Sequence, residues 1–269
     1  MTRRSVGTRC VGTSSLGKRM KTILAALIGG TLWSSAMANA TEIKVISSQA
    51  IKEAYLAFAP EFERSSGYKL VTTWNGTNDI LKKLRAGEAF DMVILVTPSM
   101  EDMIKEGKVV AGSRVDLVRS GIAIAVPAGA PKPDISTTDA VKRALLAAKG
   151  IGYSSGPSGV FLESLFKRWG IWDQVGPRIK QTPPGTPVGS ILARGDVDIG
   201  FQQVSELMLY PGIQYVGPVP KDMQHVSVFC GGVHTAAKSP DVARALLKFI
   251  LSPVALPFIK HSGMEQGAS

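Results

Sequence analysis

The chain has 269 residues, of which 45% are hydrophobic and 19% charged, and it contains 28 glycines and 16 prolines. This composition is typical of a folded α/β protein and excludes a disordered chain, a coiled coil or a collagen. The formal net charge is +10, but residues 1–40 hold six basic and no acidic side chains. Residues 41–269 therefore carry 25 basic against 21 acidic side chains, a net charge of +4. This small excess gives little support to nucleic-acid binding, and we expect no nucleic-acid partner.

Residues 1–40 have the pattern of an N-terminal extension followed by a cleaved secretory signal peptide. A basic segment at 18–21 precedes a short apolar segment at 22–33, and small residues precede a cleavage point after Ala40. The apolar segment is shorter than the roughly 20 residues that span a bilayer, which favours a cleaved signal over a membrane helix. The alternative is a buried N-terminal helix. We expect Met20 rather than Met1 to start the chain, and we expect an exported, soluble protein in the periplasm.

Cysteine and histidine are too sparse for the common disulfide and metal frameworks. Cys10 leaves with the signal peptide and Cys230 then has no partner, so we expect no disulfide bond. The sequence has no Cys-x-x-Cys pair, no His-Glu-x-x-His motif and no glycine-rich nucleotide loop. We therefore expect neither a metal nor a cofactor.

Short apolar segments alternate with amphipathic ones in the first half of the chain. Apolar residues three and four apart favour a helix, as at Ile51, Tyr55, Phe58 and Phe62. The pattern predicts strands at 43–46, 69–74 and 91–95, and helices at 50–66, 77–87 and 98–107. Such alternation predicts a parallel sheet, whose ligands bind at the carboxyl ends of its strands.

The second half continues this alternation. The predicted strands are 119–127, 150–153, 197–201 and 226–235; the loops are 128–136 and 154–159; the helices are 137–149, 160–169, 187–195, 240–251 and 253–262. We expect an α/β protein of two lobes, each a mixed, mainly parallel sheet flanked by helices. Residues 41–120 and 226–269 would form lobe I, and residues 121–225 lobe II.

Three predicted strand ends share hydroxyl side chains and glycines directly before a helix. They are Ser47-Ser48, Gly76-Thr77 and the loop 154–159. Unpaired amide N–H groups and the positive end of the helix dipole hold an anion at such a place. Ordinary N-capping is the better explanation for any one of them taken alone. Three at the carboxyl ends of strands favour an anion site.

Four segments carry a resemblance to a known family, namely 43–48, 84–94, 154–172 and 188–207. They resemble the type II periplasmic solute-binding proteins, and within them the molybdate-binding-protein-like group of ABC transporters. The resemblance covers residues 42–265. It implies a type II periplasmic-binding-protein fold with a ligand cleft between the lobes. It also implies a monomer that delivers a small anionic ligand to an ABC permease and its ATPase.

The binding loops depart from the pattern of the molybdate binders. Ser47-Ser48-Gln49-Ala50 stands where these have an Ala-Ala-Ser-Leu-like loop, and Asn75-Gly76-Thr77 stands where they have Gly-Ser-Ser. Gln203 replaces a tyrosine, and amide groups suit a planar ligand with several oxygens; polar packing at a strand end is the alternative. We therefore expect a carboxylate rather than molybdate. The predicted ligand-binding residues are Ser47, Ser48, Gly76, Thr77, Ser155, Ser158, Gly159 and Gln203.

An enzyme remains the second hypothesis, because the chain is also similar to the periplasmic aconitate isomerases. Interconverting trans- and cis-aconitate requires a base that removes a carbon-bound proton and an acid that returns one. The candidates are His225, His234, Glu163 and Glu206. Each also has a simpler explanation, as a packing residue, an exposed residue or a carboxylate that stabilises a helix N-terminus. From the sequence we favour a binding protein over an isomerase.

Overall fold

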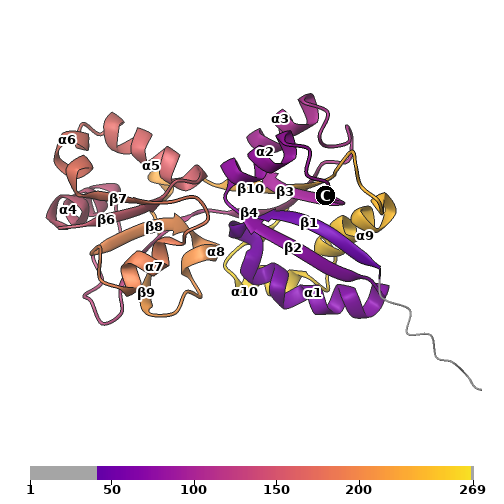
Figure 1. Cartoon of the computed structure of the whole chain (residues 1–269). Helices are drawn as coiled ribbons and strands as arrows, with labels where there is room; N and C mark the ends of the chain where they lie inside the picture. Colours follow the sequence, from indigo (N-terminus) through magenta and orange to yellow (C-terminus); the bar gives the residue numbers. More distant parts are fainter. Residues whose placement is uncertain (1–40, 268–269) are drawn as a thin grey trace, which may run out of the picture. The chain divides into compact units, whose positions relative to one another are not determined.

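Two β-sheets organise residues 41–267, which are the residues that the computed structural model of the chain describes (Figure 1). The strands are β1 (Glu42–Ser48), β2 (Lys69–Asn75), β3 (Met92–Val96), β4 (Val115–Ser120), β5 (Ile122–Pro127), β6 (Ile151–Ser154), β7 (Ile179–Thr182), β8 (Ile199–Gln203), β9 (Ile213–Pro218), β10 (Ser227–Val233) and β11 (Glu265–Gln266). One sheet has the order β11-β4-β10-β3-β1-β2 and the other β7-β6-β8-β5-β9.

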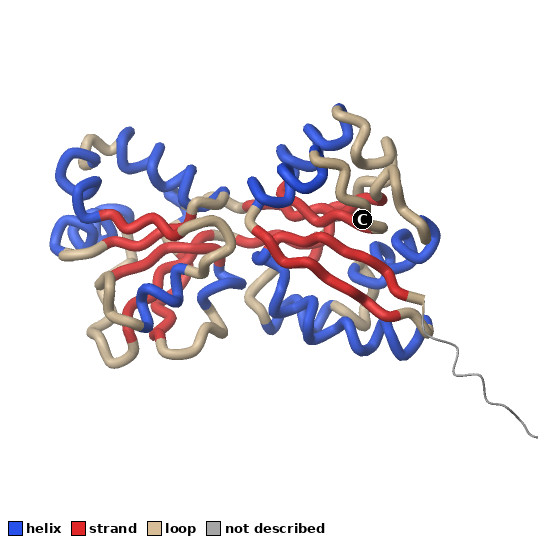
Figure 2. The backbone as a smooth tube through the Cα atoms, in the orientation of Figure 1, coloured by secondary structure: helices blue, strands red, loops and turns tan. Residues whose placement is uncertain are grey.

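Helices cover both faces of each sheet (Figure 2). They are α1 (Lys52–Ser66), α2 (Thr77–Arg85), α3 (Thr97–Lys105), α4 (Thr138–Ala147), α5 (Pro157–Arg168), α6 (Trp172–Val175), α7 (Val188–Ala193), α8 (Val204–Leu207), α9 (Pro240–Ile250) and α10 (Leu256–His261), with the 3-10 helices η1 (Gln49–Ile51), η2 (Gly176–Arg178) and η3 (Lys221–Met223). We call the six-stranded sheet with its helices lobe I, and the five-stranded sheet with its helices lobe II. The predicted boundaries of the lobes, 120/121 and 225/226, remain a proposal.

Alternating side chains of the strands build a separate core on each face of the lobe I sheet. Met92 and Ile94 face one way and pack with α1, α9 and α10, whereas Val93 and Leu95 face α2 and α3. Lobe II repeats this arrangement, with one core against α4 and α5 and another against α7 and α8. Because every residue of β3, β6 and β8 is buried, the sequence shows mainly apolar runs in these strands.

The predicted strand 119–127 is in fact two strands that belong to different sheets. β4 ends at Ser120, β5 begins at Ile122, and Gly121 lies between them as the chain crosses from lobe I to lobe II. Gln224, on the returning segment, accepts from the Ile122 amide N at 2.6 Å and donates to its carbonyl O at 3.0 Å. A Cβ at Gly121 would lie 3.0 Å from the Gln224 amide, so the two crossing segments approach closely.

Other predicted elements differ in extent. Helix α5 begins at Pro157, three residues earlier than expected, so Ser158 and Gly159 lie in its first turn. Strands β7, β9 and β11 occupy segments to which the sequence assigned no element. Among the strand pairings of residues 41–267, four are parallel and five antiparallel, so the sheets are mixed but not mainly parallel.

The predicted signal peptide lies outside the described residues. Within residues 41–267, none of the helices combines the length and the apolar character that crossing a membrane requires. Cys230 is buried and forms no disulfide bond with any described residue.

Candidate functional site

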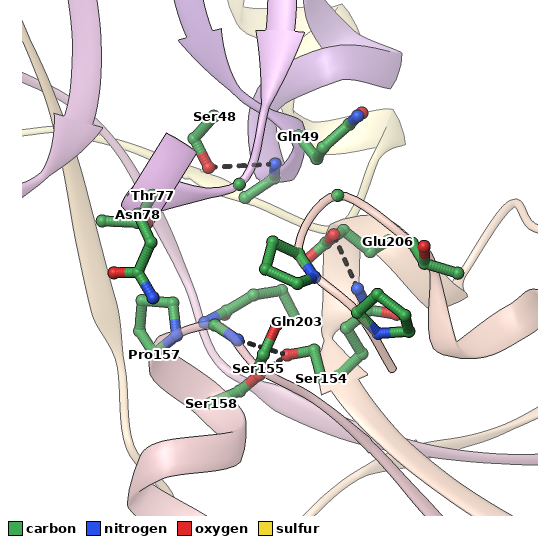
Figure 3. Close-up of a pocket in the computed structure, with 18 of the residues that line it drawn as sticks. Ser48, Gln49, Thr77, Asn78, Ser154, Ser155, Pro157, Ser158, Gln203 and Glu206 are labelled. Atoms are coloured by element: carbon green, nitrogen blue, oxygen red, sulfur yellow. Dashed lines mark hydrogen bonds between the residues drawn. The ribbon is translucent and has the colours of Figure 1, made fainter. Parts of the chain in front are cut away.

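One pocket collects most of the predicted ligand-binding residues (Figure 3). The described residues 41–267 belong to one compact unit. This pocket, which we call the central pocket, has a volume of about 50 Å³ and lies between lobe I and lobe II. The predicted residues that line it are Ser48, Gly76, Thr77, Ser155, Ser158, Gln203 and Glu206. Ser47 and Gly159 of the predicted set do not line it.

The end of β1 supplies the first wall. The Ser48 Oγ accepts a hydrogen bond from the Ala50 amide N at 3.3 Å and so caps η1. Ser47 is fully buried, and its Oγ donates to the Ser48 carbonyl O at 3.2 Å. Successive side chains of a strand point to opposite faces, and only Ser48 of this pair lines the pocket.

The beginning of α2 supplies the second wall. Gly76 is the N-cap residue of α2 and offers no side chain to cap the helix. The first amide N–H groups of a helix have no partner within it, so those at the start of α2 are available to a ligand. Asn78, which sequence reasoning missed, lines the pocket beside Thr77.

The beginning of α5 supplies the third wall, at the carboxyl end of β6. The Ser154 Oγ lies 3.2 Å from the Ser158 Oγ and accepts from the Gly156 amide N at 3.3 Å. A Cβ at Gly159 would overlap the carbonyl oxygen of Ser154. Gly159 therefore allows the first turn of α5 to approach β6, which brings the amides of this turn to the pocket.

A fourth wall comes from the loop Pro183–Thr186, which sequence reasoning missed. The Thr186 amide donates to the Pro183 carbonyl O at 3.0 Å, and Gly185 adopts a φ of +75°. A Cβ at Gly76 would lie 3.0 Å from the amide N of Gly185, so this loop of lobe II touches the start of α2 in lobe I. Pro-Pro-Gly is a turn signal that marks the loop in the sequence.

The two glutamines at the end of β8 have different partners. The Gln202 Oε1 accepts from the Val188 amide N at 2.7 Å, and its Nε2 donates to the Glu206 carboxylate at 2.7 Å. In the amide orientation that pairs both ends of Gln203, its nitrogen donates to the Ser120 carbonyl O at 2.9 Å and its oxygen accepts from the Ser227 Oγ at 2.9 Å. Gln203 thus links the two segments that cross between the lobes.

Glu206 is the only charged or titratable side chain among the described residues that line the central pocket. Burial raises the pKa of Glu206 from 4.5 to about 7, against the opposing effect of the hydrogen bond from Gln202. A carboxyl group that is half ionised near neutral pH can both accept and return a proton, which is the requirement for general acid–base chemistry.

The remaining candidates for proton transfer lie away from the central pocket. Glu163 forms an ion pair with Lys167 at 2.6 Å on the exposed side of α5. His225 stacks on the Phe161 ring at 4.7 Å. His234 is buried, and its Nδ1 accepts from the Ala236 amide N at 3.1 Å. In this structure these three side chains do not reach the pocket that Glu206 lines.

Replacing Glu206 with Gln is expected to stabilise the fold at alkaline pH. The folded-state pKa lies above 4.5, so the folded protein holds more protons than the unfolded chain between pH 4.5 and about 7. The contribution of Glu206 to stability therefore falls as pH rises through this window. We expect E206Q to gain about 2–3 kcal/mol over wild type at pH 8 and little at pH 4. Urea unfolding of both proteins at the two pH values measures this, and an equal difference at both would contradict the elevated pKa.

Comparison with known sequences identifies a matching family and similar proteins. A family described as bacterial extracellular solute-binding protein matches residues 43–265. An aconitate isomerase from a Pseudomonas species is 37% identical over 231 residues, covering 84% of this chain and 88% of that protein. The molybdate-binding protein ModA of Escherichia coli K12 is 18% identical over 235 residues, covering 85% of this chain and 91% of ModA.

Solved structures show the same fold at low sequence identity. The periplasmic molybdate-binding protein of Azotobacter vinelandii superimposes with a TM-score of 0.70 at 16% identity, over 83% of this chain and 98% of that one. A periplasmic thiamin-binding protein gives a TM-score of 0.68 at 13% identity, over 86% of this chain and 84% of that one. The two-lobe α/β fold predicted from the sequence is thereby confirmed.

Proposed function

Because this chain belongs to the family of bacterial extracellular solute-binding proteins, we propose that its central pocket binds a small polycarboxylate of the aconitate type and isomerises it. The observation that carries the proposal is Glu206, the one titratable side chain among the described residues of the pocket, with a pKa of about 7. The 37% identity to an aconitate isomerase over most of both chains also supports the proposed isomerisation.

Recognition of the acid within the central pocket relies on neutral groups. Helices α2 and α5 begin at the central pocket, and the hydroxyls of Ser48, Thr77 and Ser158 lie among its lining residues. Amide N–H groups and helix dipoles hold carboxylates without a full countercharge. Contact of the two lobes around the ligand excludes water, which strengthens each of these hydrogen bonds.

The proposed reaction is an allylic proton shift. The ionised Glu206 removes a proton from the methylene carbon of trans-aconitate, and the electron pair of the broken C–H bond delocalises through the double bond into a carboxylate. The protonated Glu206 then returns a proton to the former vinylic carbon, where a new C–H bond forms. The double bond has moved by one position, and Glu206 is ionised again.

Gln202 positions this carboxyl group. Its side-chain amide bridges two groups, accepting from the Val188 backbone N and donating to the Glu206 Oε1, both at 2.7 Å. The bond fixes the side chain of Glu206 and leaves its other carboxylate oxygen without a partner among the described residues. That oxygen is the one we assign to proton transfer.

The second candidate function is delivery of the acid to an ABC permease and its ATPase from the periplasm, after export through the predicted signal peptide. The observation that favours it is the hydroxyl- and amide-rich lining, which is sufficient for binding without chemistry. In this case Glu206 would act in its protonated form, as a hydrogen-bond donor to the ligand.

A thermal-shift screen of the chain from Thr41 onward tests the class of ligand. We expect trans-aconitate, cis-aconitate or a closely related acid, at about 100 times its Kd, to raise Tm by about 5–10 °C. Molybdate, tungstate and sulfate are expected to leave Tm unchanged. A shift with molybdate or tungstate alone would contradict the proposal. The shift should also shrink as pH rises through about 7, because ionised Glu206 repels an anionic ligand.

A further inference from the structure

A second pocket, which we call the side pocket, adjoins the central pocket. It has a volume of about 350 Å³ and lies between the start of α1 in lobe I and the segment that follows α8 in lobe II. Gln49 and Glu206 line both pockets. The other residues that line the side pocket are Lys52, Glu53, Pro187, Ser205, Leu209, Tyr210 and Pro211. A ligand that contacts Glu206 in the central pocket therefore lies at the opening of the side pocket.

The central pocket is too small to enclose a six-carbon tricarboxylate. Its volume is about 50 Å³, enough for a few water molecules, since one water needs about 10–15 Å³ by this measure. Part of such a ligand must therefore extend beyond the central pocket, and the side pocket, seven times larger, begins at Glu206.

Lys52 is the one cationic side chain among the described residues that line the side pocket. It is the first residue of α1 and half-buried, and its Nζ makes no ion pair with any residue between 41 and 267. Lys52 follows Ser48 by four residues through η1 and the start of α1. The rise of these helices separates the Cα atoms of the two residues by about 6–8 Å. This distance is of the order of the length of a six-carbon acid.

The acidic neighbours of Lys52 leave its charge available. Glu53 is exposed to solvent, and residues adjacent in sequence do not face each other on a helix. Glu206 is bonded to Gln202, and its raised pKa leaves it about half neutral near pH 7.

We propose that Lys52 binds one carboxylate of a tricarboxylate ligand in the side pocket, while the hydroxyls and amides of the central pocket bind the remainder. The proposal rests on the proposed function, because it assumes an organic acid as the ligand. According to this proposal, the Lys52 ammonium group makes the protein bind a tricarboxylate more tightly than a dicarboxylate.

Calorimetric titration of Lys52→Met with two ligands tests this assignment. The ligands are trans-aconitate and trans-glutaconate, a dicarboxylate with the same allylic chain. Lys52→Arg preserves the charge, and Lys82→Met, on the exposed side of α2 away from both pockets, controls for the loss of a positive charge. We expect Lys52→Met to weaken trans-aconitate binding by about tenfold or more, as loss of a partly buried ion pair does, and trans-glutaconate binding by less than about threefold.

The possible outcomes separate the two proposals. Equal affinity of wild type and Lys52→Met for trans-aconitate overturns the role of Lys52 and leaves the proposed function intact. Equal weakening of both ligands also overturns it, because the ammonium would then not distinguish three carboxylates from two. Failure of wild type to bind either acid overturns the proposed function and this inference together. Retention of trans-aconitate affinity in Lys52→Arg and Lys82→Met supports the ion pair.

Discussion

Replacing Glu206 with Gln is expected to lower the kcat for aconitate isomerisation by about 10³-fold while leaving aconitate binding within a few fold. The substitution keeps the size of the side chain and a hydrogen-bond partner for Gln202, but it removes the group that accepts the proton. Because the ionised form is the base, kcat of wild type should rise with pH through the ionisation of Glu206, whose pKa is about 7 before the ligand binds. Kd from calorimetry and kcat from initial rates at several pH values check both parts.

Glu163→Gln is the matched control for this prediction. Glu163 is also on lobe II, but it pairs with Lys167 on the outside of α5 and does not line the central pocket. Its substitution should change kcat by less than about twofold, as expected for an exposed ion pair. Equal turnover in wild type and E206Q would show that Glu206 is not the group that transfers the proton. It would also remove the main support for an enzyme.

Replacing Gly159 with Ala is expected to cost about 3 kcal/mol of stability, or about 6–12 °C in Tm. The new Cβ would overlap the carbonyl oxygen of Ser154 and approach the ring of Tyr153. Ser154 belongs to β6, which lies between β7 and β8 in the lobe II sheet, so neither the oxygen nor the strand can move away easily. The start of α5 must instead withdraw from β6 and from the central pocket. The substitution should therefore weaken ligand binding as well.

Gly156→Ala provides the comparison within the same loop. A Cβ at Gly156 would find its nearest neighbour, the Ser154 Oγ, at 3.4 Å, and the backbone there is extended at φ −82° and ψ −171°. We expect a change of less than about 1 kcal/mol. If thermal unfolding gave both variants the same Tm as wild type, the close approach of α5 to β6 would not be the reason for glycine at position 159.

The strand ends and the helix starts were predictable from the sequence because they depend on local chemistry. Ser48 and Gly76 follow apolar runs with residues that favour caps, and each precedes a helix in the structure, whereas α5 begins three residues before its predicted start. Parallel pairing places the ends of β1 and β2 at one edge of the lobe I sheet, and the loop after β6 reaches the same pocket from the lobe II sheet. The resemblance to the molybdate-binding-like group is confirmed by the comparisons, and it fixed the fold more firmly than periodicity did.

The remaining features depend on tertiary structure, which periodicity does not report. Nothing in the apolar run 119–127 reveals that Gly121 divides it between two sheets. Of the adjacent residues Ser47 and Ser48, Ser48 alone lines the central pocket, because successive side chains of a strand point to opposite faces. Glu206 differs from an ordinary surface glutamate only through its burial beside Gln202, and burial follows from the approach of the segments around it.

The most direct test of the account is proton NMR of the chain from Thr41 onward mixed with pure trans-aconitate at neutral pH. We predict that resonances of cis-aconitate appear and grow until the two isomers reach equilibrium. We also predict that pure cis-aconitate converges on the same mixture, and that E206Q leaves both isomers unchanged over the same time. Persistence of both pure isomers with wild-type protein, under conditions where calorimetry shows them bound, would contradict an isomerase and leave a carrier of organic acids.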